Sequence, residues 1–269
     1  MEATTGTVTA PDGIDLFTHR WVPDDPKASV LIVHGAGEHA GRWDHVGRFL
    51  ADRGYAVAAF DIRGHGQSGG HPFHVDDFEE FVDDLGAVGE TLDDSIPWVL
   101  YGHSMGGLIA TLYLTSERPQ PDAAVLSSPG LDDNLPGYLH VAGELLGRVT
   151  PKMAVENSFT AEQLCSDPAV GEAYFADPLV QTKATTGLGR AGFAAQREAN
   201  RRLDQIRVPT LVFHGADDAL VPPSASAPLA GIDGVERKVY PGMRHETHNE
   251  PDRDQVLADV ADWIDSTLA

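Results

Sequence analysis

Residues 98–114 read WVLYGHSMGGLIATLYL, an apolar run followed by Gly102-His-Ser-Met-Gly106 and then by apolar residues at helical spacing. This order predicts a strand, a tight turn and a helix, with Ser104 raised on the turn as a nucleophile. Side chains at positions 102 and 106 would collide with backbone in such a turn, so only glycine fits there. The alternative is an ordinary helix start with Ser104 as its N-cap, but the preceding strand pattern favours the nucleophile.

Further apolar runs predict a parallel sheet. Several of them are continuously apolar, which is typical of strands buried on both faces. Residues 5–9 and 15–21, around Ala10-Pro-Asp-Gly13, predict an antiparallel hairpin at one edge. The other expected strands are 29–33, 55–60, 98–101, 123–126, 210–213 and 235–240, and helical spacing covers 75–92, 105–117 and 251–268. We therefore expect an α/β fold, with one mostly parallel, eight-stranded, doubly wound sheet and helices on both faces.

The connection between the expected strands 123–126 and 210–213 is far longer than the usual connection of about 4–6 residues. We expect a single domain over 1–269 with an inserted, mostly helical cap at 130–205, above the carboxyl edge of the sheet. A helix facing the cleft there would suit medium or long acyl chains; alternatively, its apolar residues form the cap's own small core. The residues at helical spacing are Tyr138, Leu139, Ala142, Leu145, Leu146 and Val149.

The composition excludes several classes of function. Lys and Arg number 19 against 41 Asp and Glu, a formal net charge of -22, which argues against a nucleic-acid partner. Cys165 is the single cysteine, so an intrachain disulfide and a cysteine metal cluster are excluded, and a structural thiol is expected. Because the first residues lack a leader pattern and the chain lacks a run long enough to span a bilayer, we expect a cytoplasmic protein.

A serine nucleophile needs a base and an orienting acid, and in this arrangement they follow it along the chain, each after a late strand. Asp217 and Asp218 follow strand 210–213, and either could be the acid. Strand 235–240 is followed by Pro241-Gly-Met-Arg-His-Glu-Thr-His248, which offers His245 as the base. The histidines at 65, 71, 74, 103 and 214 are interpreted as structural supports around tight loops.

The turn His34-Gly-Ala-Gly-Glu-His39 superficially resembles a metal-ligand cluster. It lies on a glycine-containing turn after a strand and not on a helix, where the spacing of helical metalloproteases would work. A better role is an oxyanion hole, made by the backbone amides of Ala36 and of Met105 just after the nucleophile. The expected chemistry needs neither a metal nor an organic cofactor.

Six stretches, taken together, resemble the monoacylglycerol lipase family and its bacterial relatives among small esterases and lysophospholipases, and they cover nearly the whole chain. The resemblance implies the α/β-hydrolase fold, Asp218 as the acid and His245 as the base. The stretches are His34 to Arg42, Phe60 to Ser68, Gly102 to Gly107, Ser166-Asp-Pro168 with Asp177-Pro-Leu179, Gly215-Ala-Asp-Asp218, and His245-Glu-Thr-His248.

The same resemblance implies a polar pocket for the glycerol leaving group, at positions that Glu38, Arg42 and His248 match. Glutamate can accept hydrogen bonds from diol hydroxyls, while arginine and histidine can donate. The alternative is that Glu38 and Arg42, four residues apart, simply pair at the surface. Trp43 stands where relatives often carry tyrosine, so the preference for acyl length stays open.

These observations predict hydrolysis of monoacylglycerols and related small acyl esters through an acyl-enzyme. Lysophospholipid, thioester or aryl ester hydrolysis, or acyl transfer on the same triad, is the second interpretation. A non-catalytic ligand-binding protein of the same fold is the third. The expected partners are a small-molecule ester and at most a transient lipid surface, which the negative charge would disfavour when the lipids are acidic.

Overall fold

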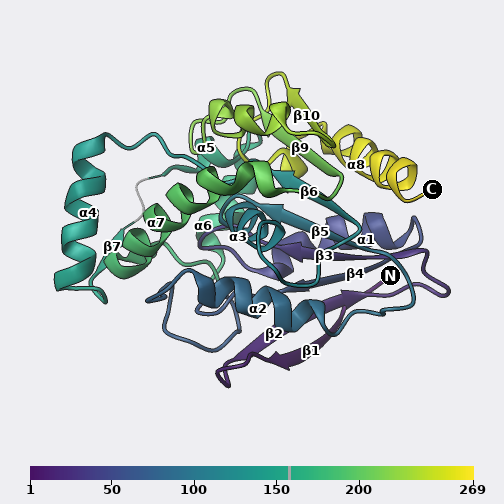
Figure 1. Cartoon of the computed structure of the whole chain (residues 1–269), viewed down its shortest axis with the longest axis horizontal. Helices are drawn as coiled ribbons and strands as arrows, with labels where there is room; N and C mark the ends of the chain where they lie inside the picture. Colours follow the sequence, from purple (N-terminus) through teal and green to yellow (C-terminus); the bar gives the residue numbers. More distant parts are fainter. Residues whose placement is uncertain (157–158) are drawn as a thin grey trace.

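A central eight-stranded sheet organises the computed structural model, which describes residues 1–156 and 159–269 (Figure 1). Its order is β1-β2-β4-β3-β5-β6-β9-β10; β2 pairs antiparallel with β1 and β4, and the other pairs are parallel. The mostly parallel sheet with an edge hairpin is therefore confirmed. The strands are β1 Thr4–Thr9, β2 Asp15–Trp21, β3 Ala28–Val33, β4 Tyr55–Phe60, β5 Trp98–His103, β6 Ala123–Ser127, β9 Thr210–Gly215 and β10 Val235–Tyr240.

Burial on both faces explains the continuously apolar strands. In β3, Val30 and Ile32 belong to one hydrophobic core, and Leu31 and Val33 belong to the other. Successive side chains of a strand point to opposite faces, so each face of β3 must be apolar. The first core is covered by α1 (Asp44–Ala51) and α8 (Arg253–Leu268), and the second by α2 (Glu79–Gly89), α3 (Met105–Leu114) and α7 (Thr186–Arg202).

The long connection between β6 and β9 is mostly helical, as expected. Its last helix, α7, contributes Leu188, Ala191 and Ala195 to the main core, so this helix also belongs to the layer that covers the sheet. The boundaries 130–205 of the cap stay a prediction. Before α7 come α4 (Gly137–Val149), β7 (Ala154–Glu156), α5 (Ala161–Leu164), α6 (Pro168–Ala176) and β8 (Lys183–Thr185), and η2 (Leu203–Gln205) follows it.

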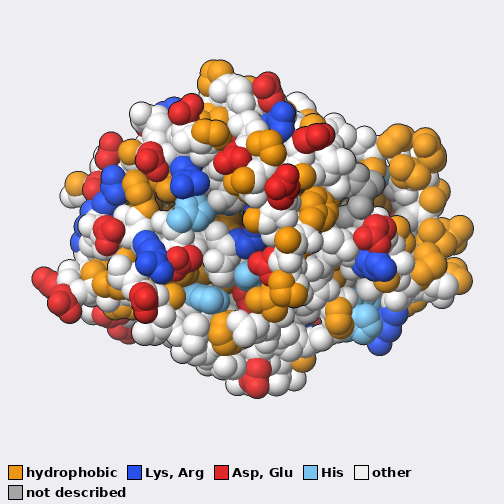
Figure 2. Space-filling view, turned by 180° about the vertical axis from the view of Figure 1, so that it is seen from behind, with side chains coloured by type: hydrophobic (Ala, Val, Ile, Leu, Met, Phe, Trp, Pro, Cys, Tyr) orange, Lys and Arg blue, Asp and Glu red, His pale blue; other side chains and the backbone are white. Residues whose placement is uncertain are grey.

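The expected helix at 138–149 forms as α4 and projects from one end of the molecule (Figure 1). It packs against α7 through Gly147, where an added Cβ would lie 2.5 Å from the Thr186 oxygen. Helix α4 leaves three large hydrophobic residues mostly exposed: Tyr138 (71%), Val141 (70%) and Val149 (71%). Figure 2 shows the resulting gathering of hydrophobic side chains at this end. Among the described helices, none is long and apolar enough to cross a bilayer.

Candidate active site

The nucleophile turn joins β5 to α3. Ser104 has φ 53° and ψ -117°, a conformation that a residue with a Cβ rarely adopts. A Cβ on Gly106 would lie 2.1 Å from the Val33 oxygen, and one on Gly102 would lie 2.5 Å from the Gly106 oxygen. These glycines therefore allow β5, the turn and β3 to approach closely, which holds Ser104 in its strained position.

Neighbouring parallel strands bring the acid and the base together. Asp218 follows β9 and His245 follows β10, and His245 Nδ1 donates to Asp218 Oδ2 at 2.7 Å. Asp218 Oδ1 accepts from the backbone amides of Leu220 and Val221 at 2.9 and 3.0 Å. Asp217 is exposed, so of the two aspartates left open by the residue pattern, the structure brings Asp218 to the histidine.

The charges of this pair reinforce each other. Burial by itself would lower the pKa of His245, but the adjacent carboxylate of Asp218 raises that pKa above its ordinary value. Burial would likewise raise the pKa of Asp218, and its histidine partners hold it well below the usual range. The acid therefore stays ionised and stabilises the imidazolium form of His245, which is what a triad acid must do.

Ser104 and His245 line one cavity of about 160 Å³. The backbone of the His245 loop is fixed from β6, because Ser128 Oγ donates to the His245 oxygen at 3.1 Å. His103, on the other side of the base, lies 4.9 Å from His245 between ring centroids. His103 was interpreted as structural, and its contact with Ser127 Oγ at 3.1 Å agrees with that role.

The turn after β3 runs alongside the nucleophile, since a Cβ on Gly35 would lie 3.1 Å from Ser104 Cβ. His34 supports this turn: its Nε2 accepts from the Ile62 amide at 2.9 Å, so Nδ1 carries the hydrogen and donates to the Gly35 oxygen at 2.8 Å. Within residues 1–156 and 159–269, neither the Ala36 nor the Met105 amide donates a hydrogen bond to the protein's backbone. Both amides are available to an oxyanion.

Glu38, Arg42 and Glu246 form a buried ionic cluster. Glu38 accepts from the Gly35 amide at 2.5 Å and from Arg42 at 2.7 Å, and Arg42 donates to both carboxylate oxygens of Glu246 at 2.8 Å. Both glutamates are only 2% exposed, so a surface pair of Glu38 with Arg42 is wrong. Burial by itself would raise the pKa of Glu246, whereas Arg42 lowers it to about 2. The cluster joins the turn after β3 to the loop of the base.

His248 lies deeper, in the short helix η4 (Thr247–Asn249). Its ring stacks on Trp43 with 4.0 Å between centroids, and among the described residues neither ring nitrogen finds a hydrogen-bond partner. Burial holds the pKa of His248 well below its ordinary value, so the ring is neutral. Of the three residues assigned to glycerol, Glu38 lines the cavity at Ser104, whereas Arg42 and His248 are not among its described lining residues.

The apolar wall of the cavity comes from Phe159, Leu164 and Tyr174 of the cap and from Leu220 and Val221 after β9. Helix α4 contributes none of the described lining residues, so the expectation that this helix faces the cleft is wrong. The alternative, that the apolar residues of this helix form the cap's own small core, is also wrong, because Tyr138, Leu145 and Val149 are exposed. That core contains Leu164, Cys165 and Tyr174, which lie outside α4. Helical spacing in a sequence predicts an apolar stripe but does not say which surface covers it.

The segment 161–185 of the cap, here called the inner cap, holds both catalytic loops. The Glu246 amide donates to the Leu164 oxygen at 2.8 Å, and the Gln181 amide donates to the Gly37 oxygen at 2.7 Å. The Tyr174 ring centroid lies 4.7 Å from the Arg42 guanidinium carbon. Sequence reasoning missed Glu246 and these backbone bonds; a glutamate directly after the proposed base was the one local signal.

The chain is similar to known proteins in sequence and in fold. The model of the family described as "Serine aminopeptidase, S33" matches residues 24–252. The chain belongs to this family. It is 38% identical to the monoacylglycerol lipase of Mycolicibacterium smegmatis over 95% of each chain, and 30% identical to the phospholipase YtpA of Bacillus subtilis over 92% of this chain and 99% of the relative. The crystal structure of the Paleococcus ferrophilus monoacylglycerol lipase has a TM-score of 0.86 at 28% identity, covering 94% of this chain and 99% of the other.

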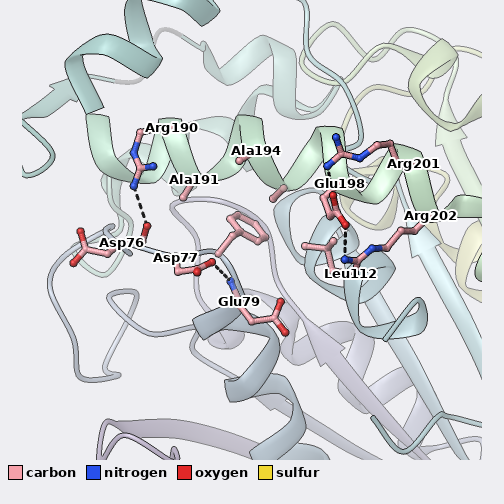
Figure 3. Close-up of a pocket in the computed structure, with 12 residues that line it drawn as sticks. Asp76, Asp77, Glu79, Leu112, Arg190, Ala191, Ala194, Glu198, Arg201 and Arg202 are labelled. Carbon is pink, nitrogen blue, oxygen red and sulfur yellow. Dashed lines mark hydrogen bonds and ion pairs between the residues drawn. The ribbon is translucent and has the colours of Figure 1, made fainter. Parts of the chain in front are cut away.

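Family membership makes the chain a serine ester hydrolase of the α/β-hydrolase fold. A second, larger groove of about 440 Å³ runs along α7 and contains none of the triad residues (Figure 3). Three of its charged side chains pair with one another, since Arg201 and Arg202 both bind Glu198. Ser104 and His245, the expected nucleophile and base, line the smaller cavity instead.

Proposed function

We propose that this chain hydrolyses monoacylglycerols to glycerol and a fatty acid. The observation that carries the proposal is the cavity at Ser104, which combines His245, an apolar wall and a buried carboxylate, Glu38. An apolar wall suits an acyl chain, and a buried carboxylate suits a hydroxylated leaving group. The relatives named monoacylglycerol lipase support this choice among esters.

The catalytic residues of the proposal are Ser104, Asp218 and His245. His245 takes the proton from Ser104 Oγ as this oxygen attacks the ester carbon, and the Ala36 and Met105 amides hold the oxyanion. The bond to glycerol then breaks, and His245 protonates the leaving oxygen. Water, activated by the same histidine, attacks the acyl-enzyme and releases the fatty acid. Asp218 stays ionised throughout because its donors hold its pKa far below neutral.

Substitution of the nucleophile tests this chemistry most directly. Ser104→Ala should lower turnover of a nitrophenyl ester by on the order of a millionfold, the loss seen when the nucleophile of a triad is removed. A fluorophosphonate probe should label the parent protein at Ser104 and leave the variant unlabelled. Undiminished ester turnover by the purified variant would sink the proposal.

The choice of substrate needs a separate comparison, since one relative is named a phospholipase and the family description names an aminopeptidase. We would measure kcat/KM on a monoacylglycerol, a lysophospholipid of the same acyl chain and an aminoacyl nitroanilide. The proposal expects the monoacylglycerol to be preferred. A higher value for the lysophospholipid would favour the second interpretation, a phospholipase on the same triad.

Glu38, Arg42 and His248 are proposed to recognise the glycerol. Glu38 would accept a hydrogen bond from a glycerol hydroxyl, and Arg42 orients that carboxylate. His248, which is not among the described lining residues, would offer ring nitrogens that have no partner among the described residues. His248→Ala should lower kcat/KM on a glycerol ester while sparing a nitrophenyl ester with the same acyl chain. Equal losses on both esters would count against the pocket.

Delivery of the substrate is proposed to involve brief contact with a lipid surface through the exposed apolar side chains of α4. The net charge of -22 should weaken this contact on acidic lipids. Cosedimentation with zwitterionic and with anionic vesicles measures both effects, and equal binding to the two would contradict the charge argument. The cytoplasmic location stays a prediction.

A further inference from the structure

A second histidine touches the catalytic acid. His214, near the end of β9, is fully buried, and its Nε2 lies 2.9 Å from the Val221 oxygen and 3.2 Å from Asp218 Oδ2. Both neighbours are acceptors, so Nε2 must carry a hydrogen; this N–H bonds the Val221 oxygen and also lies close to Asp218 Oδ2. Asp218 Oδ2 therefore faces two imidazoles, His245 Nδ1 at 2.7 Å and His214 Nε2 at 3.2 Å.

The opposite side of the His214 ring is also engaged. Nδ1 lies 3.0 Å from Ser226 Oγ, in η3 (Pro223–Gly231), and Arg237 Nε on β10 donates to the same hydroxyl at 3.1 Å. The ring is thus fixed at both nitrogens, and it cannot turn away from Asp218 without losing these contacts. Val221, whose oxygen His214 binds, also donates its amide to Asp218 Oδ1, so one ring holds both the carboxylate and the turn around it.

We propose that His214 is a positioning residue for the triad, which fixes the Asp218 carboxylate and limits how strongly that carboxylate attracts the proton of His245. The proposal deepens the proposed function and rests on it for the role of the triad. A polar N–H held close to a carboxylate stabilises the ionised form of that carboxylate and reduces its basicity. Loss of the His214 donor should therefore strengthen the pull of Asp218 on the imidazolium and raise the pKa of His245.

Other charged or titratable groups around His245 would not change with residue 214. They are Glu246 in the same loop, Glu38 from the turn after β3, His103 from β5 and His248 from η4. On the other side of the His214 ring, the charged group among the described residues is Arg237, whose Nε donates to the Ser226 hydroxyl that His214 also contacts. A shift in His245 after substitution at 214 therefore reports the contact with Asp218.

The experiment compares His214→Phe, which keeps a planar ring but removes both nitrogens, with His214→Gln, which keeps an amide donor near the position of Nε2. The readouts are the pH profile of kcat/KM on a nitrophenyl ester, NMR titration of the His245 ring, and the melting temperature. For His214→Phe we expect the acid limb of the pH profile and the midpoint of the His245 titration to rise by roughly 0.5 to 1 pH unit. We expect kcat to fall about tenfold while KM stays nearly constant. His214→Gln should return both midpoints toward the parent values.

A merely structural histidine would give lower melting temperatures with unchanged midpoints, and that result would overturn the proposal. If His214→Phe does not fold, the test rests on His214→Gln alone. A raised His245 midpoint in this variant, which keeps the donor, would contradict the proposal. The NMR titration needs no substrate, so it still tests this contact if the chain proves inactive on monoacylglycerols. Failure of the proposed function and failure of this inference are thereby distinguished.

Discussion

The two parts of the cap differ sharply in what they touch. The inner cap, residues 161–185, is bonded to the backbone on both sides of the site: the Leu164 oxygen accepts from the Glu246 amide, and the Gln181 amide donates to the Gly37 oxygen. The outer helix α4 packs against α7 and leaves its apolar side chains in solvent. One insertion therefore combines a part built into the active site with a part that is separable from it.

This difference teaches that a cap need not be a single lid. Movement of the inner cap would break buried hydrogen bonds and the contact of Tyr174 with Arg42, each of which costs free energy. Movement of α4 breaks its contacts with α7 but none of these bonds. We expect exchange and opening to be concentrated in α4 and β7, where few contacts are buried.

The largest effect should come from breaking the buried cluster that the inner cap covers. Arg42→Met leaves Glu38 and Glu246 buried without a counter-charge, which should lower the free energy of unfolding by about 3–5 kcal/mol. Arg48→Met is the matched control, because Arg48 forms an ion pair at the surface. Its Nε lies 2.7 Å from Asp44 Oδ2, and the two side chains are 44% and 43% exposed. Urea unfolding measures both, and similar losses in the two variants would refute the importance of the cluster.

A smaller effect is expected where the inner cap meets the turn after β3. Gly37 has φ 76°, and a Cβ there would lie 2.5 Å from the Gln181 oxygen. Gly37→Ala should therefore displace the Ala36 amide and lower kcat/KM by on the order of a hundredfold, as small misplacements of catalytic groups do.

Gly13→Ala is the control for backbone strain alone. Gly13 has a similar φ of 88° and open space around the added Cβ. The Gly13→Ala variant should lose little activity. Its loss of stability from left-handed backbone strain should be similar to the part of the Gly37→Ala loss that has the same cause. Equal activity in the two variants would show that the contact of cap and turn does not position the oxyanion hole.

The smallest effect is expected in α4. Replacing Tyr138, Val141 and Val149 by serine should change the free energy of unfolding by no more than about 0.5 kcal/mol per site, because these side chains are exposed. Turnover of a water-soluble ester should persist, while binding to vesicles should fall. Gly147→Val, which places a Cβ 2.5 Å from the Thr186 oxygen, should destabilise the protein instead. A triple serine variant that unfolds as readily as Gly147→Val would contradict the interpretation that α4 is separable from the inner cap.

The fold was predictable because its signals are local. The runs 55–60 and 235–240 were expected at the residues where β4 and β10 form, since an uninterrupted apolar or alternating run marks a strand directly. Helix α2 was expected from residue 75 but begins at Glu79, because Val75 and Phe78 are buried as part of the preceding loop. Apolar spacing reports burial there and not helical backbone.

The candidate site was predictable in part, for a similar reason. Ser104, Asp218 and His245 stand at the ends of strands in an order that their chemistry requires. Glu246 was missed because its partner, Arg42, lies 204 positions away, and no local pattern marks such a pair. The direction that α4 faces was missed because the stripe on a helix does not name what covers it.

The backbone at Ser104 has a consequence for how this protein can change over generations. A non-glycine residue at φ 53° and ψ -117° stores strain on the order of 1–3 kcal/mol. Glycine at position 104 would relieve that strain, offset by up to about 1 kcal/mol from the greater freedom of the unfolded chain. Selection for activity and selection for stability therefore oppose each other at this residue. A descendant released from its reaction should lose the serine early and melt at a higher temperature without it.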